Sequence, residues 1–194
     1  MTKTQSRRSI GSVRNPAAED AILDAATAIL AEGGYAAFSI EAVARRAKAG
    51  KPTIYRWWPS KAHLLLDVYA RLKESMQDVD TGTLEGDLAG FLTNLTTFWQ
   101  GQSGGVFRSL VAEAQTDPVA ADALAAYSDG RVVHTAALIE RAKARGELRD
   151  DVDSHAASDL LSAFAWKLAL IGRLEDPEHR IPQIAAIMAR GMLK

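Results

Sequence analysis

The sequence predicts an all-α protein with a small N-terminal three-helix domain, a larger C-terminal helical domain and about nine helices in total. Three observations support this fold class. Apolar residues recur every three to four positions along most of the chain. Glycine, proline and polar capping residues interrupt this repeat at intervals that suit ordinary helices. No segment shows a convincing alternation of apolar and polar residues, which would indicate a half-buried strand.

The first two helices of the small domain are predicted from their apolar stripes and their ends. The stripes consist of Ile22, Ala26, Ile29 and Leu30 in the first helix and of Ile40, Val43, Ala44 and Ala47 in the second. Gly33 and Gly34 end the first helix, because glycine adopts a left-handed cap at little cost. Ser39 is a capping residue for the second helix, and Glu41 in its first turn is favoured by the helix dipole.

The third helix is short, basic and aromatic. Pro52 suits its first turn, where a missing backbone donor costs nothing, and Pro59 stops it. Ile54 and Trp58 lie one turn apart and are expected to face the core of the small domain. The side chains left to point outward are those of Lys51, Pro52, Thr53, Tyr55, Arg56 and Trp57. Two short helices with a tight turn between them have the geometry of a DNA-reading helix-turn-helix.

The larger domain is predicted to begin with a fourth helix, which Ser60 caps. After a polar break at residues 79–83, helical stripes cover residues 84–99, 107–114, 120–145, 154–171 and 184–193. We expect the glycines between positions 101 and 105 to end one helix. Pro177 and Pro182 are expected to bracket a loop before the last helix.

Charge is distributed unequally between the two predicted domains. The first 62 residues contain 10 Lys and Arg against 5 Asp and Glu, whereas the remaining residues contain 13 against 19. A basic small domain suits contact with phosphates, and an acidic large domain stays off a duplex. Residues 1–16, with Lys3, Arg7, Arg8 and Arg14, are interpreted as a flexible basic arm that follows the DNA backbone or enters the minor groove.

The segment of about 45 residues that contains the two short helices resembles the DNA-binding domain of the tetracycline-repressor (TetR) family of bacterial transcription factors. The residues that carry the resemblance are Gly34 and Tyr35, Ser39 and Ile40, Ala44, Thr53, Ile54 and Tyr55, Trp58, and Ser60 with Lys61. Three positions depart from the family pattern. Lys48 and Ala49 stand where the family usually has Gly and Val, so a bulky residue has to adopt a left-handed conformation at a cost of about 1 kcal/mol. Trp57 replaces a more usual His or Tyr.

The resemblance places the domains at residues 17–62 for DNA binding and 63–194 for ligand binding and dimerisation. It implies phosphate contacts by Thr53, Tyr55 and Lys61, and Ser39 near a helix N-terminus could make the same contact. The alternative is that these four residues only cap or cover the small domain. Base-edge contacts are implied for Lys51, Pro52 and Trp57. For Arg45, Arg46 and Arg56 two interpretations stay open, phosphate contacts or a solvated helix face.

A homodimer and a small-molecule effector also follow from the resemblance. Two copies of the chain would read a palindromic operator on double-stranded DNA, joined through the last two helices by Leu161, Phe164, Leu168, Ile184 and Met188. The alternative is that these residues pack within one chain. A hydrophobic or aromatic effector would release the repressor from DNA after binding among Phe91, Leu95, Phe98, Trp99, Phe107, Leu110, Val111 and Tyr127, with Asn94, Gln115 or His134 as polar contacts. The alternative for each apolar residue is ordinary core.

Enzymatic function is not expected. The chain has no cysteine, and its four histidines form no His-Glu-x-x-His motif. His63 and Asp67 lie one turn apart, but two ligands make a weak metal site, so no metal or cofactor is predicted. The polar N-terminus shows no signal peptide, and no membrane span is found, which favours the cytoplasm. The competing hypothesis is a non-catalytic helical module that binds a ligand or protein and has lost operator binding.

Overall fold

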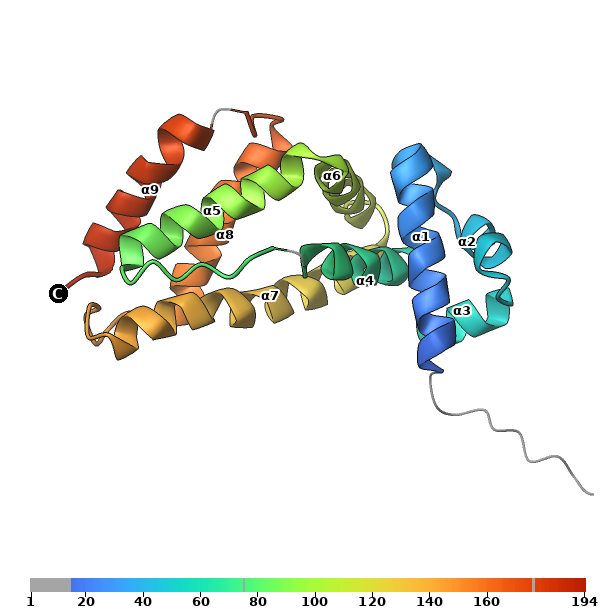
Figure 1. Ribbon diagram of the computed structural model, residues 1–194, viewed down its shortest axis with the longest axis horizontal. Coiled ribbons are helices and arrows are strands. Elements are labelled where there is room, and N and C mark those ends of the chain that lie inside the picture. Colours follow the sequence, from blue (N-terminus) through green and yellow to red (C-terminus); the bar gives the residue numbers. More distant parts are fainter. Residues whose placement is uncertain (1–14, 75, 176) are drawn as a thin grey trace, which may run out of the picture.

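The computed structural model describes residues 15–74, 76–175 and 177–194. Within these residues the fold is all-α, as predicted. The helices are α1 (Pro16–Ala37), α2 (Ile40–Ala47), α3 (Lys51–Trp57), α4 (Lys61–Lys73), α5 (Leu84–Gln100), α6 (Gln102–Ala114), α7 (Pro118–Ala144), α8 (Ser154–Leu170) and α9 (Pro177–Met192). Helices α1 to α3, together with the first turn of α4, form a head at one end of the molecule, and α5 to α9 form a body at the other (Figure 1). None of the described helices is long and apolar enough to cross a membrane.

The head is held together by one core and three side-chain caps. Ile22, Val43 and Ile54, one from each helix, are completely buried. The side chains of Asn15, Ser39 and Ser60 accept backbone N–H groups at the starts of α1, α2 and α4, the last two as the sequence predicts. Helix α1 begins at Pro16, so the predicted arm lies almost wholly in residues 1–14, outside the described part of the chain. At Gly34 the φ angle is 63°, which interrupts the regular α1 helix where a glycine end is expected.

Helix α4 connects the head to the body and contacts both (Figure 1). Arg71, near the end of α4, forms an ion pair of 2.9 Å with Asp24 on α1 of the head. The last residue of α4, Lys73, lies in the wall of two cavities in the body. Any displacement of the end of α4 therefore reaches the head through a single rigid element.

In the body, α5 packs along α9, and α7 packs along α8. Two predicted helix boundaries are wrong. Helix α6 begins at Gln102, so only Gly101 separates it from α5, and Gly104 and Gly105 lie inside it. Helix α9 begins at Pro177 and contains Pro182. Pro182 lies in the second turn of α9, where it removes one backbone hydrogen bond of the helix.

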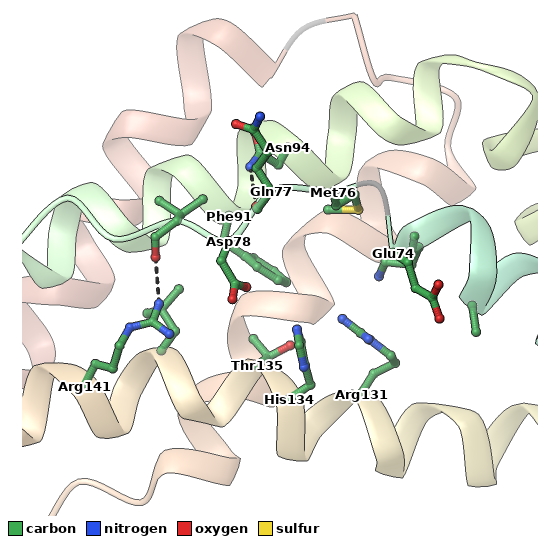
Figure 2. A pocket seen from close by; sticks show the side chains of 14 residues that line it. Glu74, Met76, Gln77, Asp78, Phe91, Asn94, Arg131, His134, Thr135 and Arg141 are labelled. Atoms are coloured by element: carbon green, nitrogen blue, oxygen red, sulfur yellow. Dashed lines mark hydrogen bonds between the residues drawn. The ribbon is translucent and has the colours of Figure 1, made fainter.

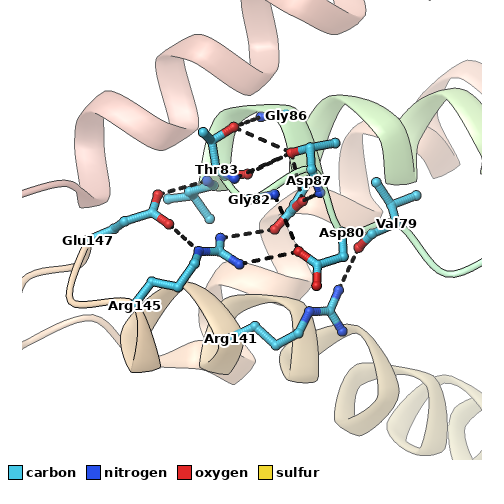
Figure 3. A network of polar contacts seen from close by, with 11 residues as sticks. Val79, Asp80, Gly82, Thr83, Gly86, Asp87, Arg141, Arg145 and Glu147 are labelled. Atoms are coloured by element: carbon cyan, nitrogen blue, oxygen red, sulfur yellow. Dashed lines mark hydrogen bonds and ion pairs between the residues drawn. The ribbon is translucent and has the colours of Figure 1, made fainter.

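A polar network fastens the start of α5 to the end of α7 (Figure 3). The carboxylate of Asp87, which is fully buried, accepts the Thr81 N–H at 2.6 Å and a guanidinium N–H of Arg145 at 3.0 Å. Glu147 accepts a second N–H of Arg145 and the Leu84 N–H at the start of α5. Burial alone would raise the pKa of Asp87, but the hydrogen bonds from Thr81 and Arg145 outweigh it and lower the pKa.

Candidate functional site

The turn between α2 and α3 contains a lysine in the left-handed conformation. Lys48 has φ 51° and ψ 35°, and its N–H donates to the carbonyl of Ala44 at the end of α2. The N–H of Ala49 also donates to Ala44, at 3.0 Å. The prediction of a strained bulky residue in this turn is confirmed, and the tight reversal brings α3 across α2.

Helix α3 buries one side and exposes the other. Ile54 is 0% exposed and Trp58, directly after the helix, is 1% exposed, as the sequence predicts. The indole Nε1 of Trp58 donates to the carboxylate of Asp67 on α4 at 2.6 Å. Four residues on the opposite side are exposed, Lys51, Pro52, Tyr55 and Arg56, whereas Thr53 and Trp57 are half-buried. The buried anchor therefore fixes the exposed face of α3 relative to the rest of the head.

The basic side chains of the head have partners that differ in kind. Lys51 forms an ion pair of 3.0 Å with Glu41 on α2, which raises the pKa of the lysine. The ammonium of Lys61 lies 3.8 Å from the centre of the Tyr35 ring, and partial burial lowers its pKa. The guanidinium of Arg56 lies over the Trp57 ring, at 5.7 Å. All three cations are positioned by neighbours that leave part of each side chain accessible.

Three other candidate phosphate contacts of the head, Ser39, Arg45 and Arg46, differ in how free their side chains are. Ser39 Oγ accepts the Ala42 N–H, so its oxygen is used as a helix cap. Arg46 donates two hydrogen bonds to Glu32 on α1, at 2.6 and 2.7 Å, which occupies its guanidinium within the head. Arg45 is exposed. Of the two arginines of α2, Arg45 is therefore the better placed for a phosphate contact.

His63 and Asp67 do not pair with each other. Asp67 accepts the Trp58 indole, and Nδ1 of His63 lies 2.8 Å from the Ser60 hydroxyl. Among the described residues no group of three or more His, Asp and Glu side chains is arranged to hold a metal ion. Sequence reasoning missed the role of Asp67, because nothing in its local pattern identifies an indole as its partner.

The body contains an apolar cavity of about 480 Å³, here called the aromatic cavity. Its lining is Tyr69, Lys73, Phe91, Leu95, Trp99, Phe107, Tyr127, Ser128, Arg131, Val132, Thr135, Asp159, Ser162, Ala163, Trp166, Lys167 and Leu170. Five of the eight predicted ligand residues are among them: Phe91, Leu95, Trp99, Phe107 and Tyr127. Of the other three, Phe98 packs edge-on against Tyr69, Leu110 is fully buried in the core, and Val111 packs half-buried against it.

Aromatic rings build one wall of this cavity. Phe107 stacks on Trp99 with ring centres 4.7 Å apart and meets Trp166 edge-on at 4.9 Å. The indole of Trp99 donates a hydrogen bond to the hydroxyl of Tyr69. Burial raises the pKa of Tyr69 far above its ordinary value and that of Tyr127 to about 12, so both phenols are neutral. Sequence reasoning missed Tyr69 and Trp166, which lie on helices not assigned to the cavity.

A second cavity of about 320 Å³, here called the polar cavity, adjoins the first (Figure 2). The two share Lys73, Phe91, Arg131 and Thr135 in their walls. Arg131, His134 and Arg141 extend from α7 toward the segment that follows α4. Of the predicted polar contacts, Asn94 and His134 line this cavity, whereas Gln115 donates to the carbonyl of Val111 and lines neither cavity.

The predicted dimer residues divide into two groups. Leu161 and Leu168 are 0% and 1% exposed, so they pack into the core of their own chain. Phe164, Ile184 and Met188 are half-buried. The most exposed large apolar residues of α8, the turn after it and α9 are Leu160, Leu170, Ile171 and Ile187. Helices α8 and α9 thus do expose apolar side chains, but these are not the residues that the sequence predicts for a dimer interface.

Comparison with known proteins agrees with the arrangement of head and body. Residues 22–68 match the family model described as bacterial regulatory proteins of the tetR family, and residues 78–188 match that of the tetracyclin repressor-like C-terminal domain. The HTH-type transcriptional regulator YdeS of Bacillus subtilis is 33% identical over 87% of this chain and 85% of its own length. The DNA-binding transcriptional repressor TetR of Mycobacteroides abscessus is 32% identical over 80% of this chain and 84% of its own. The crystal structure of the TetR family transcription regulator SCO0332 has a TM-score of 0.80 at 28% identity and covers 91% of this chain and 99% of that one. The chain therefore belongs to the TetR family of bacterial transcriptional regulators, which bind DNA and are not enzymes.

Proposed function

We propose that this regulator is a repressor that binds a palindromic operator as a homodimer and leaves it when a small, largely apolar effector enters the body. The observation that carries the proposal is the orientation of α3. Ile54 and Trp58 anchor the helix, which leaves Lys51, Tyr55 and Arg56 exposed on one face. A short rigid helix with such a face suits the major groove. Relatives named as repressors favour repression over activation.

In this proposal the base contacts and the phosphate contacts come from different residues. Lys51, Pro52 and Trp57 meet base edges, and Lys suits the acceptors of guanine. Thr53, Tyr55 and Lys61 meet phosphates, which position the head without reading sequence. The ion pair between Lys51 and Glu41 is exposed on both sides, so exchanging it for a contact with DNA costs little.

The dimer is proposed to form through apolar residues of α8 and α9, chiefly the exposed Leu160 and Ile187 and the half-buried Phe164 and Met188. Leu160 and Ile187 are 67% and 66% exposed in the single chain, and a partner that covers them would remove this apolar surface from water. Two heads on a twofold axis would contact half-sites with centres about 34 to 36 Å apart, one turn of DNA.

Effector control is proposed to act through α4. This helix has Tyr69 and Lys73 in the wall of the aromatic cavity and Arg71 paired with Asp24 of the head. A ligand that favours one position of α4 shifts the population of head orientations, with a coupling typically of about 1 to 3 kcal/mol.

The test is a salt-dependent binding assay with the intergenic DNA upstream of the protein's own gene. The full chain is expected to bind at nanomolar concentration and to protect a twofold-symmetric site. Lys61→Ala should weaken all sequences alike and reduce the salt slope by about one, whereas Lys51→Ala should relax preference at one base pair of each half-site. Equal, sequence-independent losses in both variants would contradict the division of roles. Binding no tighter than to random DNA would favour a helical module that has lost operator binding.

A further inference from the structure

The aromatic cavity contains more positive charge than an apolar effector requires. Its walls include three basic side chains, Lys73, Arg131 and Lys167, against one acidic side chain, Asp159. These residues come from three helices, since Lys73 ends α4, Arg131 lies in the middle of α7 and the other two belong to α8. The packing of three helices, and not one basic segment of the sequence, therefore brings these basic side chains together.

Two hydrogen-bond donors of this wall have no partner within the described part of the chain. They are Nε of Arg131 and the hydroxyl of Tyr127, and both atoms are shielded from solvent. A buried donor without an acceptor is unfavourable by about 1 to 3 kcal/mol, and more when it carries charge. The two residues lie one helical turn apart on α7, so an acceptor placed between them could satisfy both.

Arg131 lies close enough to Lys73 to disfavour the positive charge of the lysine. Burial, together with the positive charge of Arg131, lowers the pKa of Lys73 to about 7. The carboxylates in the walls of the two cavities are Asp159 of the aromatic cavity and Glu74 and Asp78 of the polar cavity. Figure 2 shows the last two. No described carboxylate forms an ion pair with Lys73 or Arg131. This end of the cavity thus has two neighbouring basic side chains and no carboxylate paired with either among the described residues.

We propose that the effector is an amphipathic anion, with an apolar, preferably aromatic, body and one anionic group such as a carboxylate or sulfonate. The anionic group accepts hydrogen bonds from Arg131, Lys73 and the Tyr127 hydroxyl. The body lies among Trp99, Phe107 and Trp166. This inference rests on the proposed function only in treating the aromatic cavity as the effector site.

The anionic group also explains how a ligand in the body can act on the head. Arg131 belongs to α7, and Lys73 is the last residue of α4, the helix that contacts the head through Arg71. An anion between Lys73 and Arg131 removes their mutual repulsion and draws the end of α4 toward α7. A neutral ligand of the same shape fills the cavity without this effect.

The experiment compares two fluorescent probes that share an aromatic body. 1-Anilinonaphthalene-8-sulfonate has an anionic group, and N-phenyl-1-naphthylamine lacks it; both become fluorescent in apolar surroundings. Each probe is titrated into the full-length protein and into the variants Arg131→Gln, Arg131→Lys and Arg108→Gln. Arg108 is an exposed arginine of α6 outside the cavity lining, so its variant controls for loss of one positive charge.

Wild-type protein is expected to bind the sulfonate about 10- to 100-fold more tightly than the neutral probe, the range of a buried charge-assisted hydrogen bond. Arg131→Gln should remove this preference and leave the Kd of the neutral probe unchanged, whereas Arg131→Lys and Arg108→Gln should keep most of it. Equal affinity of wild type for both probes, or a parallel loss of both in Arg131→Gln, would overturn the proposal. If Arg131→Gln does not give a wild-type circular dichroism spectrum, Lys73→Gln takes its place with the same expectations.

These titrations contain no DNA, so they separate the inference from the proposed function. Preference for the sulfonate in a protein that binds no operator would support the anion site and contradict the proposed regulator. Operator binding together with equal affinity for the two probes would do the reverse.

Discussion

Gly104, at the start of α6, is predicted to tolerate no side chain at all. It is buried directly after the turn at Gly101, and an added Cβ would lie 2.0 Å from the carbonyl oxygen and 3.2 Å from the Cα of Trp99. The obstructing atoms are backbone atoms of the last turn of α5, so they can move only if the helix end moves. The next residue, Gly105, is its natural control, because a Cβ there meets nothing within 4 Å.

The two alanine variants separate close packing from helix propensity. Alanine favours a helix over glycine by up to about 1 kcal/mol, and this gain is common to Gly104→Ala and Gly105→Ala. Overpacking costs about 1 to 3 kcal/mol, and a clash with backbone at 2.0 Å belongs at the upper end of this range. We expect Gly105→Ala to be neutral or slightly stabilising, and Gly104→Ala to lie about 3 kcal/mol below it in free energy of unfolding.

Urea unfolding followed by circular dichroism at 222 nm measures this difference. Wild type and both variants are compared at one protein concentration, because the stability of any protein that self-associates depends on concentration. Near-ultraviolet spectra should also change in Gly104→Ala, since Trp99 stacks on Phe107 beside the clash. Unfolding free energies of the two variants within about 0.5 kcal/mol of each other would refute the assignment of Gly104 as a close-approach position.

Two further predictions concern the body network and the head turn. Asp87→Ala should lower the free energy of unfolding by about 3 kcal/mol, because it leaves the Thr81 N–H and one guanidinium nitrogen of Arg145 without their carboxylate partner. Asp80 also pairs with Arg145 but is exposed, so Asp80→Ala should change the free energy of unfolding by less than about 0.5 kcal/mol. Folding lowers the pKa of Asp87, so the carboxylate stabilises the fold fully above the unfolded pKa near 3.9, and this stabilisation is lost as pH falls through the lower folded pKa. The urea midpoints of wild type and Asp87→Ala should therefore converge below about pH 4. A difference between the midpoints that stays constant with pH would contradict this. Lys48→Gly should raise the thermal midpoint and stabilise the fold by up to about 1 kcal/mol, because Lys48 has φ 51°; an unchanged or lower midpoint would contradict a strained turn.

The head could be predicted from the sequence because its determinants are local. A serine before an apolar stripe is a short-range signal, and Ser39 and Ser60 cap α2 and α4. The spacing of Ile54 and Trp58 likewise identifies the buried side of α3 without knowledge of its neighbours. Asp67 is the exception, since its hydrogen bond to Trp58 depends on how α4 crosses α3.

The body was harder to predict because apolar residues lie on more than one side of its helices. In α8, Leu160 and Leu161 are adjacent, yet the first is 67% exposed and the second fully buried. The helical period cannot decide which of two neighbouring leucines faces the core when both lie in apolar stripes. The sequence also gives no indication that Lys73 and Arg131 line the same cavity, because only the packing of α4 on α7 brings these two residues together.

Of the four tryptophans of the chain, two lie in the head and two line the aromatic cavity of the body. Trp57 and Trp58 belong to the head, where they meet edge-on at 5.8 Å, and Trp99 and Trp166 line the aromatic cavity. Replacing either pair by phenylalanine leaves the emission of the other. One chain thus supplies separate optical reporters for its head and its body, so the order in which the two ends change when a small molecule is added can be timed without any attached dye.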